Sequence, residues 1–328
     1  MKLSACLLAT ITGLLLLLVP HHLVAASPKP EKQKDQVKIA AVQISGYDKG
    51  DLPREGYDVS KLLVPYIDRA QKDGADLVVF PEYLLGHISV PGPETKRISA
   101  AAAANRIYVI VGCWEVNEDK SYANTALIFD RQGKIAGKYQ KTHAAVDHFE
   151  GEPAWSRPPT RKDRDWFLRN DPEWTMNRGE DLPVFDFDFG RVGILTCYDG
   201  WFPESFRTLS LKGAELILWV NGRRGAVEDF IMKSAMFQSH VAMVCTNQAY
   251  GGGTMIGNVP AQILARCPDG EEAYITADVD LARVRQAREF SRNFQQRRPR
   301  LYGVITRTDL FSDQPSPAKN ENVNSRKK

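Results

Sequence analysis

Short apolar runs alternate with amphipathic segments along most of the chain. An uninterrupted apolar run is typical of a strand buried on both faces, whereas apolar residues spaced three and four apart are typical of a helix packed on a sheet. The runs predict strands over residues 37–44, 76–80, 107–115, 192–196, 216–220 and 241–247. The amphipathic segments predict helices over residues 59–72, 94–105, 203–211, 228–239 and 281–289. This alternation indicates an α/β fold in which helices cover sheets.

Two further stretches have the turn residues of antiparallel strand pairs. Residues 123–130 and 134–139 flank a turn that contains glycine, and they predict a hairpin. Residues 254–265 and 271–277 flank Pro-Asp-Gly at 268–270, and they predict a second pair. The fold should therefore combine parallel and antiparallel strands.

The first 26 residues are typical of a secretory signal peptide. Lys2 precedes an apolar run over residues 7–19, and the small residues at 24–26 suit cleavage after Ala26. We therefore expect export to the periplasm or the extracellular space, with a polar leader at residues 27–36. An uncleaved membrane anchor is the alternative, although the run is short for a spanning helix. No second apolar run of spanning length follows, so we expect no stable membrane insertion after cleavage.

Residues 37–311 are predicted to form one domain with a long insertion at about 147–181. The insertion is rich in aromatic residues, among them Trp155 and Trp174, and poor in helical pattern. Such an excursion is typical of a pocket wall or lid, and a surface loop or a subunit contact is the alternative. Residues 312–328 lack apolar periodicity and should form a disordered tail.

Charge and cysteine content exclude some classes of function. The chain has 43 Lys and Arg against 40 Asp and Glu, and losing the signal peptide lowers its net charge from +3 to +2. So small an excess does not create a nucleic-acid-binding surface, and we expect no nucleic-acid partner. Four cysteines remain, and a domain of this size does not need disulfides; the disulfide state of Cys113, Cys245 and Cys267 stays open.

The most informative stretch is RVGILTCYDGWFPE, residues 191–204. An apolar strand ends on Cys197, a tight polar turn follows, and Pro203 begins a helix. A strand that ends on a cysteine and turns into a helix can hold a nucleophile, and the N–H groups after it can receive negative charge. The alternative is a cysteine buried in the core.

Two other strand ends carry groups that a thiol nucleophile would need. Glu82 directly follows the strand over 76–80, and Lys141 directly follows the strand over 134–139. Each residue alone would be an ordinary loop charge. Because ligand sites gather at the carboxyl ends of strands, the three strand ends together indicate a site with a thiol, a proton acceptor and a cation.

At these residues the sequence resembles the nitrilase superfamily of carbon–nitrogen hydrolases. The resemblance rests on VKIAAVQI, VVFPEYLL, KYQKTH, GILTCYDGWFPE, GAELILWV and RRPRLYG, and it covers about residues 37–303. The motifs with Glu, Lys and Cys stand in the family's order. The signal peptide, the long insertion and the stretch YGGGTMIGN depart from the family pattern.

The resemblance implies a four-layer α-β-β-α sandwich and a role for each site residue. Cys197 would attack the substrate carbon, Glu82 would act as general base, and Lys141 with the N–H of Tyr198 would stabilise the oxyanion. The family often has a second glutamate between the Lys and the Cys. Glu150 is the favoured candidate and Glu152 the alternative.

The expected activity is exported hydrolysis of a small amide or N-carbamoyl compound through a cysteine thioester. A nitrilase or an amine acyltransferase with the same site is the alternative, and a non-catalytic binding protein is an alternative of another class. The resemblance implies no cofactor and a homodimer or higher homo-oligomer. Asn221 and Arg223 are further pocket candidates by position, and Arg223 could instead pair with Glu228. No Cys or His pair has the spacing of metal ligands, so no metal is expected.

Overall fold

A computed structural model describes residues 34–46, 58–145 and 172–307. The predicted signal peptide and most of the polar leader, the C-terminal tail, and the larger part of the insertion with Glu150, Glu152 and Trp155 lie outside these ranges. The side chain of Trp174 is also outside the description. Within the described residues, no helix is long and apolar enough to cross a lipid bilayer.

Two mixed sheets form the centre of the protein. In the first, the strands lie in the order β13-β1-β2-β4-β5-β6, and β3 pairs with β4. Its strands are β1 (Gln36–Gln43), β2 (Leu77–Val79), β3 (His87–Ile88), β4 (Tyr108–Val116), β5 (Tyr122–Phe129), β6 (Ile135–Gln140) and β13 (Ala273–Asp280). In the second, the order is β12-β11-β10-β9-β8-β7. Its strands are β7 (Val184–Phe187), β8 (Gly190–Thr196), β9 (Leu216–Val220), β10 (Ala242–Thr246), β11 (Met255–Asn258) and β12 (Gln262–Arg266).

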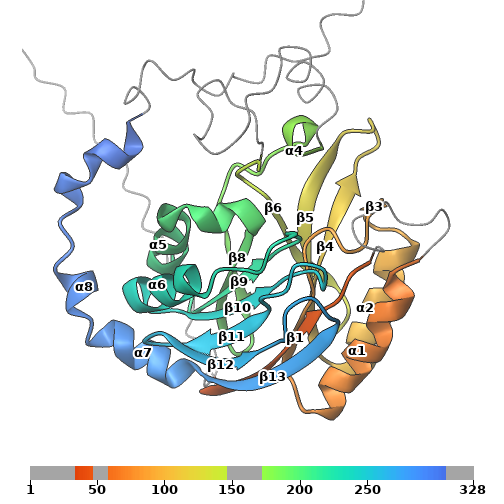
Figure 1. Ribbon diagram of the computed structural model, residues 1–328, viewed down its shortest axis with the longest axis horizontal. Helices are drawn as coiled ribbons and strands as arrows, with labels where there is room; N and C mark the ends of the chain where they lie inside the picture. Colours follow the sequence, from red (N-terminus) through yellow and green to blue (C-terminus); the bar gives the residue numbers. More distant parts are fainter. Residues whose placement is uncertain (1–33, 47–57, 146–171, 308–328) are drawn as a thin grey trace, which may run out of the picture. The chain divides into compact units, whose positions relative to one another are not determined.

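Helices cover the outer face of each sheet, as Figure 1 shows for α1 and α2 on one side and α5 and α6 on the other. These helices are α1 (Ser60–Lys72), α2 (Pro93–Asn105), α5 (Pro203–Leu211) and α6 (Asp229–Ser239). The remaining elements are α4 (Pro172–Thr175), η1 (Cys197–Trp201), α7 (Leu281–Glu289), α8 (Arg292–Gln295), η2 (Pro299–Leu301) and η3 (Gly303–Thr306).

Strand alternation explains the four layers. In β9, Leu216 and Leu218 pack into the core between the two sheets, whereas Ile217 and Trp219 pack under α5 and α6. Because successive side chains of a strand point to opposite faces, a strand between two cores must be apolar at every position. The uninterrupted runs in the sequence are therefore the signature of the α-β-β-α sandwich, and the predicted fold is confirmed.

One predicted strand pair is wrong. The sequence suggested that residues 254–265 and 271–277 pair around the turn at 268–270, but β11 and β12 pair with each other and β13 joins β1 in the other sheet. Eight registered residue pairs join β13 to β1. The Pro-Asp-Gly stretch therefore connects the two sheets, and the predicted hairpin of β5 and β6 is confirmed.

Candidate active site

Glu82 lies just beyond β2, where both sheets hold its main chain. Its N–H donates to the Asn221 carbonyl beyond β9 (3.2 Å), and the Gln248 amide beyond β10 donates to its carbonyl (3.2 Å). Gly112 of β4 packs directly on this segment: a Cβ at Gly112 would lie 2.6 Å from the Glu82 Cα. The carboxyl ends of strands from both sheets thus meet here, and Glu82 is only 1% exposed.

Lys141 lies one residue beyond β6 and contacts Glu82. Its Nζ is 3.1 Å from Oε1 of Glu82 and 2.7 Å from Oε1 of Glu173. Asn124 of β5 also donates to Glu82, with 2.7 Å between Nδ2 and Oε1. Glu82, Asn124 and Lys141 are each 1% exposed. The structure therefore places the predicted glutamate and lysine in one buried group, together with a second carboxylate.

The second carboxylate belongs to the end of the predicted insertion. Glu173 lies in α4, and its Oε2 accepts from the N–H of Ala145 (3.1 Å). Beyond α4, the N–H of Asn177 donates to the Tyr122 carbonyl (2.7 Å), and the N–H of Gly179 donates to the Lys141 carbonyl (2.9 Å). These bonds fasten the segment along β5 and the end of β6, as the position of α4 in Figure 1 shows. The insertion thus returns a glutamate to the site.

Cys197 begins η1 directly after β8, with a backbone φ of +46°. A positive φ is uncommon for a residue other than glycine, and such strain is found at functional sites. The turn is held by the Trp219 indole, whose Nε1 donates to the Cys197 carbonyl (2.7 Å). A Cβ at Gly200 would lie 2.2 Å from this indole, so the turn can pack on Trp219 only with glycine there.

Burial sets the charge states of the site. Burial raises the pKa of the Cys197 thiol, the charge of Glu82 raises it further, and Lys141 opposes both effects. Burial and the charge of Glu173 also raise the pKa of Glu82, against the opposing effect of Lys141 and Asn124. Burial alone would lower the pKa of Lys141, but Glu82 and the other negative groups outweigh it and raise that pKa. At neutral pH a protonated thiol therefore lies beside a carboxyl group suited to accept a proton and a permanent cation.

Asp199, in the turn after Cys197, is fully buried and accepts several hydrogen bonds. Donors to its carboxylate include the Thr196 N–H (3.0 Å), the Tyr139 hydroxyl (2.6 Å), and the N–H of His143 (2.8 Å). Burial acts to raise the pKa of Asp199, but the hydrogen bonds from His143, Tyr139 and Thr196 outweigh it and lower that pKa. Asp199 therefore ties the cysteine turn to the segment that carries Lys141.

Asn221 and Arg223, the pocket candidates chosen by position, hydrogen-bond to other protein groups. The Asn221 side chain donates to the carbonyls of Trp219 (2.9 Å) and Thr246 (3.1 Å). The guanidinium of Arg223 makes two hydrogen bonds of 2.6 Å to Glu228, the pairing that the sequence offered as the alternative to a substrate contact. Of the predicted residues, Glu82 and Lys141 are thus in direct contact, and both of their charges affect the pKa of the Cys197 thiol.

An aromatic wall lies beside the buried carboxylates. Tyr83 stacks on Trp114 with 5.8 Å between ring centroids, and Tyr122 meets Trp114 edge-on at 5.6 Å. Ala144 and Met176 complete this apolar cluster. The prediction of a pocket wall from Trp155 and Trp174 concerns side chains outside the description, and this aromatic cluster comes from β4, β5 and the residue after Glu82.

Sequence reasoning missed Glu173 and Asn124. Glu173 follows Pro172 in a helix-start pattern, a weak local signal, but it lies far from the Lys motif along the chain. Asn124 and its neighbour Thr125 are buried polar residues in β5, an otherwise mostly apolar strand, where a polar side chain requires a partner. That exception to the pattern could have marked Asn124. The four cysteines that the structure describes form no disulfide with one another. Among the described residues, no three His, Cys, Asp or Glu side chains are grouped to hold a metal ion.

The fold and the site define an α-β-β-α sandwich with cysteine, glutamate and lysine at the carboxyl ends of its strands. The family model described as "Carbon-nitrogen hydrolase" matches residues 38–289, and the chain belongs to this family, within the nitrilase superfamily.

Relatives at low identity agree with this assignment. A nitrilase of Pyrococcus abyssi is 28% identical over 81% of this chain and 99% of its own length. A formamidase of Bradyrhizobium sp. is 30% identical over 65% of this chain and 63% of its own. The crystal structure of a carbon–nitrogen hydrolase from Helicobacter pylori superposes with a TM-score of 0.65 at 18% identity, covering 83% of this chain and 99% of that one. The family model and the sequence relatives support hydrolysis of a carbon–nitrogen bond, and the structural neighbour supports the fold.

Proposed function

We propose that the protein hydrolyses a small amide or N-carbamoyl compound through a thioester on Cys197. The observation that carries the proposal is the buried contact of Glu82 and Lys141 beside the cysteine turn. A thiol with a raised pKa requires a proton acceptor, and a carboxyl group with a raised pKa can both accept and return a proton near neutral pH. Lys141 supplies a fixed positive charge.

In the first half-reaction, Glu82 takes the thiol proton while the sulfur of Cys197 attacks the carbonyl carbon. The negative charge that develops on the carbonyl oxygen is stabilised by Lys141 and by the N–H of Tyr198, in the first turn of η1. Glu82 then gives its proton to the nitrogen, the C–N bond breaks, and ammonia or an amine leaves.

In the second half-reaction, Glu82 takes a proton from water as the oxygen attacks the thioester carbon. The intermediate collapses, the C–S bond breaks, and the proton on Glu82 returns to the sulfur. The products are the amine and a carboxylic or carbamic acid, and the enzyme is regenerated without a cofactor.

The second glutamate of the site is proposed to be Glu173, because it contacts Lys141. Its charge helps to keep Lys141 protonated and raises the pKa of the general base. Glu150, the candidate favoured on sequence spacing, and Glu152 lie outside the described residues, so kinetics of the three Glu→Gln variants must compare them directly.

An amide is the favoured substrate class and a nitrile the second candidate, as the formamidase and the nitrilase among the relatives suggest. Ammonia release from matched panels of aliphatic amides, N-carbamoyl compounds and nitriles tests the substrate class. Mass spectrometry of the acid-quenched enzyme tests the thioester by an acyl adduct on Cys197. Loss of turnover and adduct in a folded Cys197→Ala variant is expected. Full activity of that variant would refute the proposed mechanism. It would also refute acyl transfer to an amine, because that alternative uses the same thiol.

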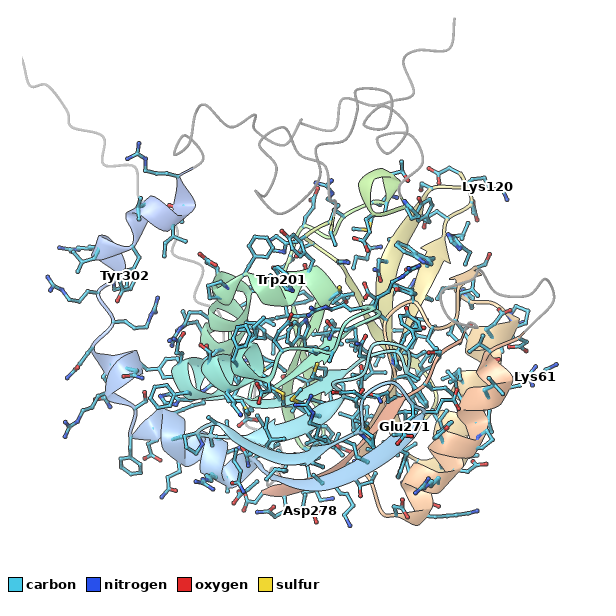
Figure 2. All side chains as sticks on the ribbon, viewed as in Figure 1. Lys61, Lys120, Trp201, Glu271, Asp278 and Tyr302 are labelled. Atoms are coloured by element: carbon cyan, nitrogen blue, oxygen red, sulfur yellow. The ribbon has the colours of Figure 1, made fainter. Side chains whose placement is uncertain are left out.

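We also propose that the protein is exported and self-associates, as its leader and its family resemblance suggest. Several large apolar side chains on η1 and α6 are exposed, including Trp201, Phe230 and Phe237; Figure 2 labels Trp201 near α5. N-terminal sequencing of the secreted protein should begin at Ser27. Light scattering should give at least twice the mass of one chain, and a monomer at all concentrations would refute self-association.

A further inference from the structure

Two donors and two carboxylate oxygens form a closed group at the centre of the site. Nζ of Lys141 lies 3.1 Å from Oε1 of Glu82 and 2.7 Å from Oε1 of Glu173. Nδ2 of Asn124 lies 2.7 Å from the same oxygen of Glu82 and 3.4 Å from the same oxygen of Glu173. Asn124 therefore duplicates the contacts of Lys141 but carries no charge.

The group leaves the other oxygen of Glu82 unoccupied. Oε2 of Glu82 is buried and has no hydrogen-bond partner among the residues that the structure describes. With Oε1 held by two donors, the carboxylate cannot rotate without breaking both bonds, so Oε2 alone is available for proton transfer.

We propose that Asn124 is a positioning residue for the general base, which pins Oε1 of Glu82 so that Oε2 exchanges the proton with Cys197. The inference rests on the proposed function, because it gives Oε2 a task only if Glu82 acts as the base. Asn124 touches neither the thiol nor the reacting carbon in this scheme and acts through Glu82.

The uncharged amide suits this place better than a second cation. Among the described residues, the titratable groups that act on Glu82 or are acted on by it are Lys141, Glu173, Cys197, Tyr83 and Tyr250. Lys141 is the single cation in that set. A second cation would favour the ionised form of Glu82 so strongly that Glu82 would be a poor proton acceptor. The Asn124 hydrogen bond lowers the pKa of Glu82 and partly offsets burial.

The amide oxygen of Asn124 indicates that this residue contributes to the site through its Nδ2 donor. Oδ1 of Asn124 has no hydrogen-bond partner within the described ranges. Leucine has nearly the same shape, so Asn124→Leu removes the bonds from Nδ2 and leaves no acceptor deprived of a donor other than Oε1 of Glu82 and Oε1 of Glu173, which Lys141 still binds.

The test is the pH dependence of Asn124→Leu on whichever amide is the best substrate. Losing a hydrogen bond to a charged group should lower kcat about 10- to 100-fold, with KM changed less than about 3-fold. Because the lost bond had lowered the pKa of Glu82, the acidic limb of the kcat/KM profile should move to higher pH. The rate of iodoacetamide reaction at Cys197 should fall in parallel at neutral pH.

Asn258→Leu is the matched control. Asn258 is also a buried strand asparagine whose amide donates to a carbonyl, that of Asp280 (3.1 Å), but it lies in β11 away from Glu82. This variant should lose stability without moving the acidic limb. Asn124→Ala repeats the test if Asn124→Leu does not fold.

An Asn124 variant that folds and keeps both kcat and the acidic limb of the native enzyme would refute the positioning role. Glu82→Gln separates that result from failure of the proposed function. If Glu82→Gln is inactive and Asn124→Leu is normal, only the role of Asn124 is wrong. If Glu82→Gln is fully active, the proposed mechanism itself is wrong.

Discussion

Replacing Gly112 with alanine should displace Glu82, the proposed general base, without changing any group proposed to react. A Cβ at Gly112 would lie 2.4 Å from the Tyr83 nitrogen and 2.6 Å and 2.7 Å from Cα and the carbonyl carbon of Glu82. Ordinary contacts between nonbonded heavy atoms are about 3.5 Å, so the segment must move by about 1 Å. All three atoms belong to the main chain, and no rotamer change can relieve the clash.

Two effects of this movement can be estimated. A misplacement of about 1 Å at a catalytic group costs about 100-fold in rate, which corresponds to about 2.7 kcal/mol of activation free energy. Forcing an extra methyl group into a packed core costs about 1–3 kcal/mol of folding free energy. We therefore expect Gly112→Ala to fold, to melt at a lower temperature, and to lose about two orders of magnitude in kcat with a smaller change in KM.

The assay is steady-state kinetics on the best amide substrate together with urea unfolding. Gly137→Ala in β6 is the control, since its Cβ would lie 2.7 Å from the Phe185 ring of β7 and would overpack a core away from Glu82. Gly225→Ala, with no atom within 4 Å of the new methyl, controls for the substitution itself. Equal losses of kcat in Gly112→Ala and Gly137→Ala would refute this reasoning. They would show that core overpacking, rather than displacement of Glu82, lowers the rate.

Three further predictions concern single side chains. Because the folded-state pKa of Asp199 is lowered, its carboxylate stabilises the fold above the ordinary aspartate pKa, and this contribution is lost as the pH falls through the lowered value. Asp199→Asn should therefore cost about 2 kcal/mol in urea unfolding at neutral pH and less in acid; parallel stability–pH curves would contradict this. Glu173→Gln should lower kcat about 10-fold or more, by more than Glu150→Gln or Glu152→Gln in the same assay; a larger loss in either of the latter two would reassign the second glutamate. Arg223→Ala should leave the kcat/KM ratio of carboxylate-bearing to neutral amides unchanged, because the Arg223 guanidinium is bound by a protein carboxylate; a shift toward neutral amides would place that guanidinium on the substrate.

The layered fold and the contact of Glu82 with Lys141 near the Cys197 turn could be predicted from the sequence. A strand buried between two cores must be apolar throughout, so runs such as that of β9 identify themselves locally. Glu82 and Cys197 lie just past such runs, and Lys141 follows the partly exposed strand β6; the carboxyl ends of parallel strands gather at one edge. These inferences need only local pattern and a general rule of sheet geometry.

Tertiary structure alone decided which distant segments meet. The turn residues at 268–270 predicted that the segments before and after them pair with each other. In the structure, β13 instead pairs with β1 in the other sheet along its whole length. Glu173 reaches Lys141 because the end of the insertion bonds to β5, and Asn124 faces Glu82 because β5 lies beside β4. The sequence determined which residues lie at the end of a strand, because the local pattern of apolar and polar residues marks where a strand stops. Which carboxylate and which amide complete the site depends on hydrogen bonds between segments far apart in the chain, which no local pattern encodes.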